Sequence, residues 1–159
     1  MHAPLTPAER ARLQSPLRLA EPPARAEAGI AARLRTAGLR PTRQRRALAM
    51  LLFSGRPRHV TAAGLAGEAA ASGIRLSLAT VYNTLNQFTA AGLLARIAIG
   101  GELAVFDTDP AHHHHFHVQE EGRLIDVPAA AIGFGRLPEP PAGYALERID
   151  VVIRLRRIA

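Results

Sequence analysis

The sequence contains no cysteine and no tryptophan, and only 4% of its 159 residues are aromatic. The absence of cysteine excludes disulfides, thiolate zinc sites and a cysteine nucleophile. No apolar run approaches the roughly 20 residues that cross a bilayer, since the run Ala47–Phe53 has only seven. The Pro- and Arg-rich start lacks the apolar stretch of a secretory signal. We therefore expect a cytoplasmic protein with no membrane partner.

Lysine is also absent, so all 20 basic residues are arginine, and they are unevenly distributed. Residues 1–100 hold 14 arginines against four glutamates, whereas residues 101–159 hold six arginines against nine acidic residues. A basic first part followed by an acidic second part is typical of an anion-binding module joined to a different one. A solvated basic surface gives the same counts, so charge alone leaves both interpretations open.

Residues 1–25 contain five prolines and predict a disordered arm. Four helical segments follow, and Thr42, Thr61 and Ser77 are placed to cap the last three. The apolar period then changes to that of strands, with a pair of glycines between two short runs. Helices followed by such a hairpin predict a winged helix-turn-helix domain over residues 26–108.

Residues 109–159 are expected to form a second domain. The pattern predicts three strands there, at His112–Val118, Arg123–Val127 and Tyr144–Leu155. The segment between the last two is rich in Pro, Gly and Ala, which leaves room for one short helical turn. The predicted fold class is therefore α+β, with an N-terminal winged helix-turn-helix domain followed by a small C-terminal α/β domain.

The fourth predicted helix, residues 78–88, has two different faces. Its apolar face carries Leu78, Val81, Leu85 and Phe88 at helical spacing. Its opposite face is uncharged and carries Ala79, Tyr82, Asn83, Asn86 and Gln87. Small residues, amides and a phenol suit base edges and thymine methyls, and phosphates can be contacted by the flanking Arg40, Arg45, Arg75 and Arg96. An exposed helix with chance amides explains this face equally well, but the basic flanks and the hairpin favour DNA.

Five of the seven histidines lie within six consecutive positions. In a strand, His113, His115 and His117 share one face, and His112 and His114 share the other. So dense a block favours metal or haem binding over a set of ordinary core or surface histidines. Imidazole with carboxylate suits divalent iron, manganese or zinc without choosing among them. Further ligands are available at His59, Asp107, Asp109, Glu120, Glu121 and Asp126.

Several stretches resemble, in the same order, the ferric uptake regulator family over about residues 30–155. They are Ala79–Leu85, Phe88 with Ala91–Leu93, Gly100-Gly101 leading to Val105–Asp107, and the histidine block. Within that family, Gly122–Pro128 and Ile149–Leu155 are most similar to the iron response regulator branch, Irr, and the lack of cysteine fits that branch. The resemblance implies a homodimeric transcription regulator, mainly a repressor and not an enzyme, with a C-terminal dimerisation domain.

The resemblance also implies site residues. It places a divalent iron, manganese or zinc ion at the hinge between the domains, held by His59, Asp107, His113, His115 and Asp126. Tyr82 matches the family's base-contacting tyrosine and Arg40 its minor-groove residue, whereas Asn83 replaces a common arginine. The predicted contacts with a roughly palindromic double-stranded operator are Arg40, Arg45, Thr80, Tyr82 and Asn83.

A second family metal site would use His112 and His114, but its remaining ligands fall near Gly133 and Ile149, which cannot ligate. In Irr-type proteins the signal is haem, and the histidine block is a haem site. Because the chain has no cysteine, the haem ligands are expected among His112, His114 and His117. Haem, or a protein that delivers it, is then a further partner.

The favoured interpretation is a regulator of iron and haem genes that responds to haem or to a divalent metal. The alternatives are a ferric-uptake or manganese-type regulator that senses free metal, a metalloenzyme, and a metal- or haem-binding protein without a DNA role. The last two need no basic helical module, and no nucleophile or proton-transfer group is evident beside an open coordination position. DNA affinity with a steep salt dependence separates the regulators from the others.

Overall fold

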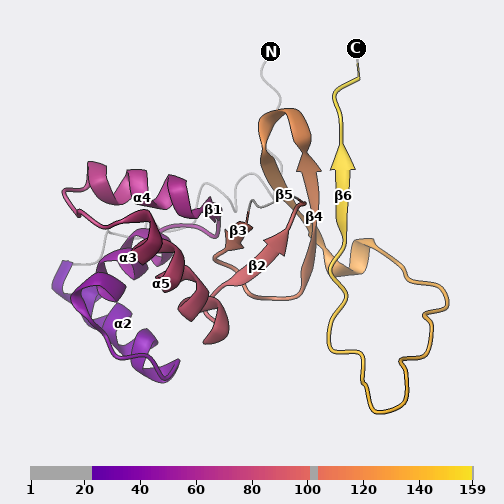
Figure 1. The fold of residues 1–159 in the computed structure, drawn as a ribbon, viewed down its shortest axis with the longest axis horizontal. Coiled ribbons are helices and arrows are strands. Elements are labelled where there is room, and N and C mark those ends of the chain that lie inside the picture. Colours follow the sequence, from indigo (N-terminus) through magenta and orange to yellow (C-terminus); the bar gives the residue numbers. More distant parts are fainter. Residues whose placement is uncertain (1–22, 101–103, 159) are drawn as a thin grey trace, which may run out of the picture.

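The computed structural model describes residues 23–100 and 104–158, so the predicted arm lies almost entirely outside the described residues. Four helices form a bundle on one side of two small sheets (Figure 1). The helices are α2 (Pro23–Thr36), α3 (Arg43–Phe53), α4 (Ala62–Ala71) and α5 (Leu78–Ala90). No helix in these described ranges is both long and apolar enough to cross a membrane.

The three predicted helix caps are confirmed. The side-chain oxygens of Thr42, Thr61 and Ser77 accept backbone N–H groups in the first turns of α3, α4 and α5, at 3.3, 3.0 and 3.1 Å respectively. Each hydroxyl satisfies one of the free N–H groups at a helix start. Gly38 follows α2 with a φ of 74°, which is the left-handed conformation expected after a helix end.

The core of the winged-helix domain consists mainly of Leu, Val and Phe side chains that pack between the helices and the first sheet. Leu48, Leu65 and Phe88 are completely buried there. On α5, Val81, Leu85 and Phe88 point inward as predicted, but Leu78 does not and is 54% exposed. Leu78 is the first residue of α5 and lies outside the core, where it lines a surface groove together with Ala79 and Tyr82.

The first sheet has the strand order β1-β3-β2, and all its pairs are antiparallel. β2 (Ala95–Ala98) and β3 (Ala104–Asp107) are the predicted hairpin, and the short β1 (His59–Thr61) adds a third strand that the sequence did not indicate. The four helices and this sheet form a winged helix-turn-helix, as predicted.

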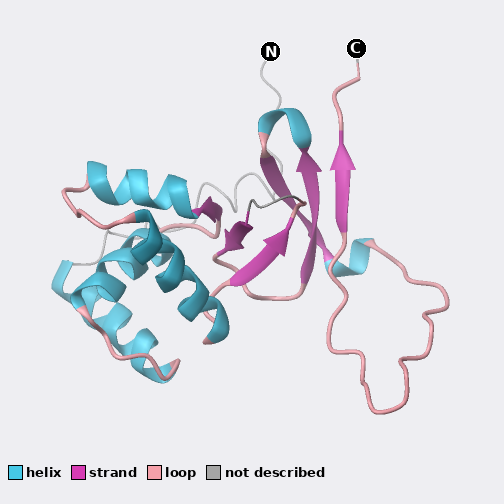
Figure 2. Cartoon of the chain, viewed as in Figure 1, coloured by secondary structure: helices cyan, strands magenta, loops and turns pink. Residues whose placement is uncertain are grey.

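The second sheet has the order β5-β4-β6 (Figure 2). Its central strand β4 (His113–Val118) pairs antiparallel with β5 (Arg123–Pro128) and parallel with β6 (Val152–Leu155). Two single 3-10 turns lie at Gln119–Glu121 and Ala129–Ala131. The α+β fold class, with a small C-terminal domain after the winged helix, is therefore confirmed.

The prediction of a long closing strand from Tyr144 is wrong, because the strand begins only at Val152. The parallel register pairs Val152 with His115. Residues much before Val152 would run past the start of β4 and find no partner strand. The chain from residue 132 to residue 151 instead forms a long exposed loop between β5 and β6 (Figure 1).

Candidate metal centre and nucleic-acid interface

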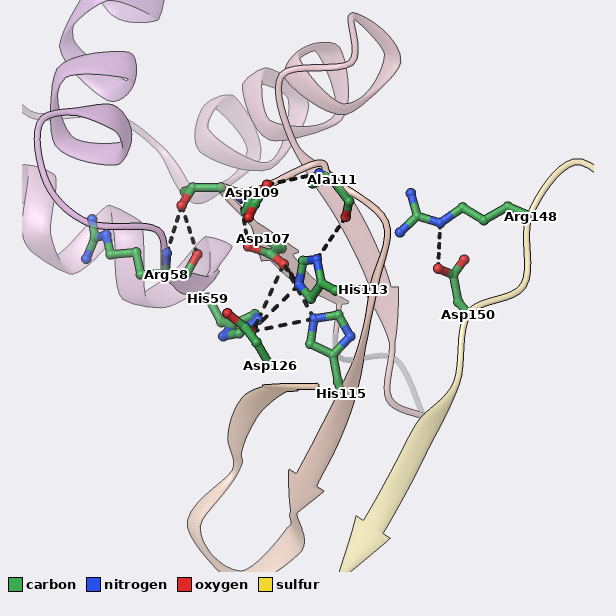
Figure 3. Close-up of polar contacts among 11 residues, drawn as sticks. Arg58, His59, Asp107, Asp109, Ala111, His113, His115, Asp126, Arg148 and Asp150 are labelled. Atoms are coloured by element: carbon green, nitrogen blue, oxygen red, sulfur yellow. Dashed lines mark hydrogen bonds and ion pairs between the residues drawn. The ribbon is translucent and has the colours of Figure 1, made fainter. Parts of the chain in front are cut away.

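Five side chains from both domains converge where the two sheets meet (Figure 3). His59 comes from β1 and Asp107 from β3, while the other three come from β4 and β5 of the C-terminal sheet. One ligand atom of each lies within 4.8 Å of the others. The set is the one that the family resemblance implied: His59, Asp107, His113, His115 and Asp126.

Strand register explains this convergence. His59 and Asp107 are paired directly across β1 and β3. In the other sheet, His115 is paired with Asp126 across β4 and β5. Because side chains two residues apart on a strand point the same way, His113 joins His115 on that face. The two pairs and His113 therefore meet between the sheets.

The Asp107 carboxylate lies at the centre of the cluster and is 1% exposed. Its Oδ2 atom is 2.8 Å from His113 Nε2, 3.4 Å from His115 Nε2 and 3.5 Å from His59 Nε2. Asp126 Oδ1 approaches from the more exposed side and lies 3.1 Å from His59 Nε2. Two carboxylates and three imidazoles thus surround one small volume.

The hydrogen bonds around His113 show why this volume favours a cation. His113 Nδ1 lies 2.8 Å from the Ala111 carbonyl oxygen, so Nδ1 carries a hydrogen and donates it. In the neutral ring, Nε2 then directs a lone pair at Asp107 Oδ2, and two lone pairs at 2.8 Å repel each other. Only a proton or a metal ion between them makes the contact favourable. His59 Nε2 and His113 Nε2 are also buried without a hydrogen-bond partner among the described residues.

The cluster shifts the pKa values of its members in different directions. Burial alone raises the pKa of Asp107, but His59 and the backbone N–H of Asp109 outweigh it and hold this pKa below its ordinary value. Burial lowers the pKa of His59, yet the carboxylates of Asp107 and Asp126 raise it overall. At His115 burial prevails, helped by repulsion from the neighbouring histidines, and the pKa is lowered. The apo site therefore favours protonation of His59 and a neutral His115.

Arg58, which the sequence analysis did not single out, anchors the site to the helices. Its guanidinium donates to both carboxylate oxygens of Glu68 on α4 at 2.8 and 2.7 Å, and to the Leu51 carbonyl at the end of α3 at 3.0 Å. Its backbone N–H donates to Thr108 Oγ1 at 2.8 Å. The one feature of the sequence that points to this role is that Arg58 directly precedes the predicted ligand His59. Arg58 thus connects α3 and α4 to the strands that carry His59 and Asp107.

The predicted haem residues do not form one site. His112 and His114 lie together, with ring centroids 5.2 Å apart, and the ring of Phe134 lies 5.8 Å from that of His114. His114 is fully buried, and neither of its ring nitrogens has a hydrogen-bond partner among the described residues. His117 lies on the opposite face of β4, the face of the metal cluster.

The outer face of α5 is partly exposed, as a reading surface requires. Asn83 and Gln87 are exposed, whereas Tyr82 is half-buried with its ring against Phe106, at 6.1 Å between centroids. Thr80 Oγ1 is 2.8 Å from Ser77 Oγ at the start of the helix.

One of the predicted arginines, Arg45, lies next to this face and contacts the backbone of another, Arg40. The Arg45 guanidinium donates from Nε and Nη2 to Gln87 Oε1 at 3.2 and 3.0 Å, and from Nη1 to the Arg40 carbonyl at 3.0 Å. Arg45 is thereby fixed beside α5. A polar groove between α3 and α5 is lined by Thr42, Gln44, Arg45, Thr80, Asn83 and Gln87.

Comparison with known proteins gives a family model and several relatives that agree with one another. Residues 36–134 match the model of the ferric uptake regulator family. The ferric uptake regulation protein of Pseudomonas aeruginosa is 38% identical over 100 residues, which cover 62% of this chain and 75% of that protein. The protein of the same name from Pseudomonas putida is 36% identical over 118 residues, covering 74% of this chain and 87% of the relative. The peroxide-responsive repressor PerR of Staphylococcus aureus is 32% identical over 95 residues, 60% of this chain and 64% of that protein.

Solved structures agree with these relatives. The P. aeruginosa ferric uptake regulator, solved with manganese, superimposes with a TM-score of 0.61 at 30% identity and covers 79% of this chain and 96% of that one. The Vibrio cholerae ferric uptake regulator gives a TM-score of 0.63 at 24% identity over 80% of this chain and 98% of that one, a likeness of fold.

Proposed function

Because the chain belongs to the ferric uptake regulator family of metal-responsive transcription regulators, we propose that it is a dimeric DNA-binding repressor of iron and haem genes. One observation carries the proposal: two ligands on the winged-helix domain and three on the C-terminal sheet converge on one cation-favouring volume. A ligand bound there affects both domains at once.

In this proposal His59, Asp107, His113, His115 and Asp126 hold one divalent ion. A bound iron, manganese or zinc ion supplies the positive charge that this donor set otherwise lacks. His59 and Asp107 hold the winged helix to the cluster, and His113, His115 and Asp126 hold the C-terminal sheet to it. Metal binding thereby favours one relative orientation of the two domains over the others, and so it shifts the population of orientations.

Within the DNA-binding domain, Tyr82 and Asn83 read bases from the outer face of α5, assisted by Thr80. Arg45 and Arg40 at the start of α3 contact the backbone or the minor groove. The support is the uncharged, exposed face of α5 beside a guanidinium that Gln87 holds in place. Amides and phenols discriminate between base edges, whereas arginine contributes affinity that depends little on sequence.

A second copy of the chain is the proposed partner of the C-terminal domain. The outer face of its sheet carries side chains that one chain leaves only half covered: Phe116, Ile125, Ile153 and Leu155. The neighbouring loop exposes more large apolar side chains, Phe134, Leu137, Tyr144 and Leu146. A twofold dimer built on this face matches a roughly palindromic operator.

Haem is the proposed signal at the other face of β4. A buried imidazole without a hydrogen-bond partner is costly, and His114 is one beside the aromatic ring of Phe134. A porphyrin brings four nitrogens of its own and needs one or two axial ligands from the protein, here His112 or His114. His117 lies on the opposite face of β4, so it would have to bind a different haem from the one held by His112 or His114.

Promoter binding measured for the apo protein, with Zn²⁺ or Mn²⁺, and with haem tests the proposal. We expect specific binding with a steep salt dependence that changes on metal addition. DNA release by haem that is lost in H112A/H114A supports the haem sensor, whereas unchanged promoter occupancy favours the free-metal sensor. No specific DNA binding under any of these conditions overturns the proposed function.

A further inference from the structure

The two domains also touch beside the metal cluster, where the wing meets the C-terminal sheet. Ile97 and Ile99 on and beside β2, with Val105 on β3, form a small apolar cluster with Leu124 on β5 and Val152 on β6. All but the half-buried Val152 are less than 10% exposed. The wing therefore lies against the sheet that carries the histidine block.

One polar contact lies at the edge of this cluster. Arg154 on β6 donates from Nη2 to the carbonyl oxygen of Ile99 at 3.0 Å. Ile99 is the residue directly after β2, and Gly100 follows it with a φ of 100°. A Cβ at position 100 would lie 3.1 Å from Arg154 Nη2, so glycine, which also adopts this positive φ without strain, leaves room for the guanidinium.

The register of the sheet places Arg154 on the same face as the proposed metal ligands. Arg154 pairs with His117, and Val152 two residues earlier pairs with His115. A single ion at the cluster fixes one point, and the apolar contacts of Leu124 and Val152 are non-directional, so neither fixes the angle between the sheets. The Arg154–Ile99 contact lies on a different strand and on the other edge of the C-terminal sheet from Asp126, so it opposes a change in that angle.

We propose that Arg154 is a positioning residue that holds the wing against the C-terminal sheet and so transmits metal occupancy to the DNA-binding domain. It touches neither the metal ligands nor the reading face of α5. Its side chain is exposed apart from this contact. Its donor links the strand β6 to the wing, and a change in the angle between the sheets that moves Ile99 away from β6 breaks that link. This inference rests on the proposed function only for its effect on DNA.

The absence of cysteine allows a direct test by site-specific spin labelling. Ala71 at the end of α4 and Ala130 in the C-terminal domain are both exposed and suit the labels. In A71C/A130C protein mixed with an excess of unlabelled parent protein, so that a dimer contains at most one labelled chain, pulsed electron resonance reports the distribution of distances between the domains of one chain without any DNA. We expect R154A and R154M, in the apo protein and with Zn²⁺, to broaden this distribution, because methionine keeps the apolar stem and removes only the donors.

The matched control is R156A, which removes the same charge from an exposed residue two positions further along. It should leave the distribution as in the parent protein. In promoter binding, R154M should reduce the Zn²⁺-dependent change in affinity by about fivefold, within the range of ordinary allosteric coupling, while R156A keeps that change. An unbroadened distribution in R154M, or an unchanged Zn²⁺ response in R154M, overturns the proposal. Broadening in a protein that never binds DNA would instead overturn the proposed function.

Discussion

At the scale of single residues, side chains that share one strand or helix have separate tasks. On β4, His113 and His115 face the domain junction, while His114 faces away from it. On α5, Val81 is buried, while Asn83 is exposed two positions later. One substitution therefore tests one task without disturbing the other face.

Asn83→Ala should weaken binding to the specific operator by about 1–3 kcal/mol and leave binding to random DNA unchanged, because an amide reads base edges. Titration of both DNAs at one salt concentration measures this difference. Gln119→Ala, which removes an exposed amide from the C-terminal domain, is the control and should change neither. Equal affinity of the N83A protein and the parent for the operator would rule out base reading by Asn83.

Arg45→Ala should weaken binding to all sequences alike and flatten the dependence on salt, because a phosphate contact releases counterions regardless of base. Gln87→Ala should act in the same direction and more weakly, since Gln87 Oε1 accepts two of the Arg45 donors. The slope of log affinity against log salt is the measurement. A loss confined to the operator would contradict this role.

Metal affinity should fall as the pH decreases towards and below about 6.5, because the ligating imidazoles must be neutral. His59, whose pKa is raised by Asp107 and Asp126, gains its proton at a higher pH than His115, whose pKa burial lowers, so the fall begins above the ordinary histidine pKa. Competition of Zn²⁺ with a chelator between pH 5.5 and 8 (roughly the range in which His titrates) measures this dependence. His59→Asn should flatten it, and a pH-independent affinity in the parent would exclude imidazole ligands.

At the scale of elements, the start of α5 is capped by one hydroxyl, that of Ser77. Ser77→Ala should lower the free energy of unfolding by about 1 kcal/mol, because Thr80 N–H loses its acceptor at the helix start. Ser72→Ala, at the end of α4, removes a hydroxyl for which the described residues show no hydrogen bond, and it serves as the control. Urea unfolding followed by circular dichroism compares the two. Equal stability of S77A and S72A would contradict the cap.

The elements also show how far the sequence predicts the fold. Thr42, Thr61 and Ser77 mark helix starts because a cap is a local hydrogen bond, and local chemistry is visible in sequence. The three-residue β1 left no periodic signal, since its place depends on pairing with distant β3. The alternating pattern around Ile149 and Val151 suggested a strand. A strand also needs a partner of matching length, and β4 is too short to pair with the residues before Val152.

For the candidate site the same distinction holds. The period of two in β4 separated the odd from the even histidines correctly. His59 and Asp107 were two of six candidate ligands in the sequence, and only the family resemblance selected them. Arg154 gave no signal of its own, because its acceptor is the Ile99 carbonyl, which every residue type offers. Arg58 was marked only by its place before His59, because its partner Glu68 is ten residues away and its other acceptor is a backbone carbonyl.

At the scale of the whole molecule, the half-covered outer face of the C-terminal sheet predicts the assembly. We expect a dimer in light scattering at micromolar concentration, and Ile153→Glu should give monomers by placing a charge on that face. Arg56→Glu, on the exposed loop after α3 in the winged-helix domain, is the control and should leave the dimer intact. A parent protein that is monomeric and still binds the operator specifically would contradict this assembly.

The parallel strand β6 has a consequence for local opening. Only four residues pair with β4, and an exposed segment of residues 132–151 separates them from the rest of the sheet. A short edge strand on a long loop gains little enthalpy and loses much chain entropy when it docks, so it opens at a lower free energy than the core does. Amide protons of β6 should exchange with solvent earlier than those of β5. Each such opening would also release Arg154 from the wing, so the lifetime of the docked strand sets how long the two domains keep a single relative orientation.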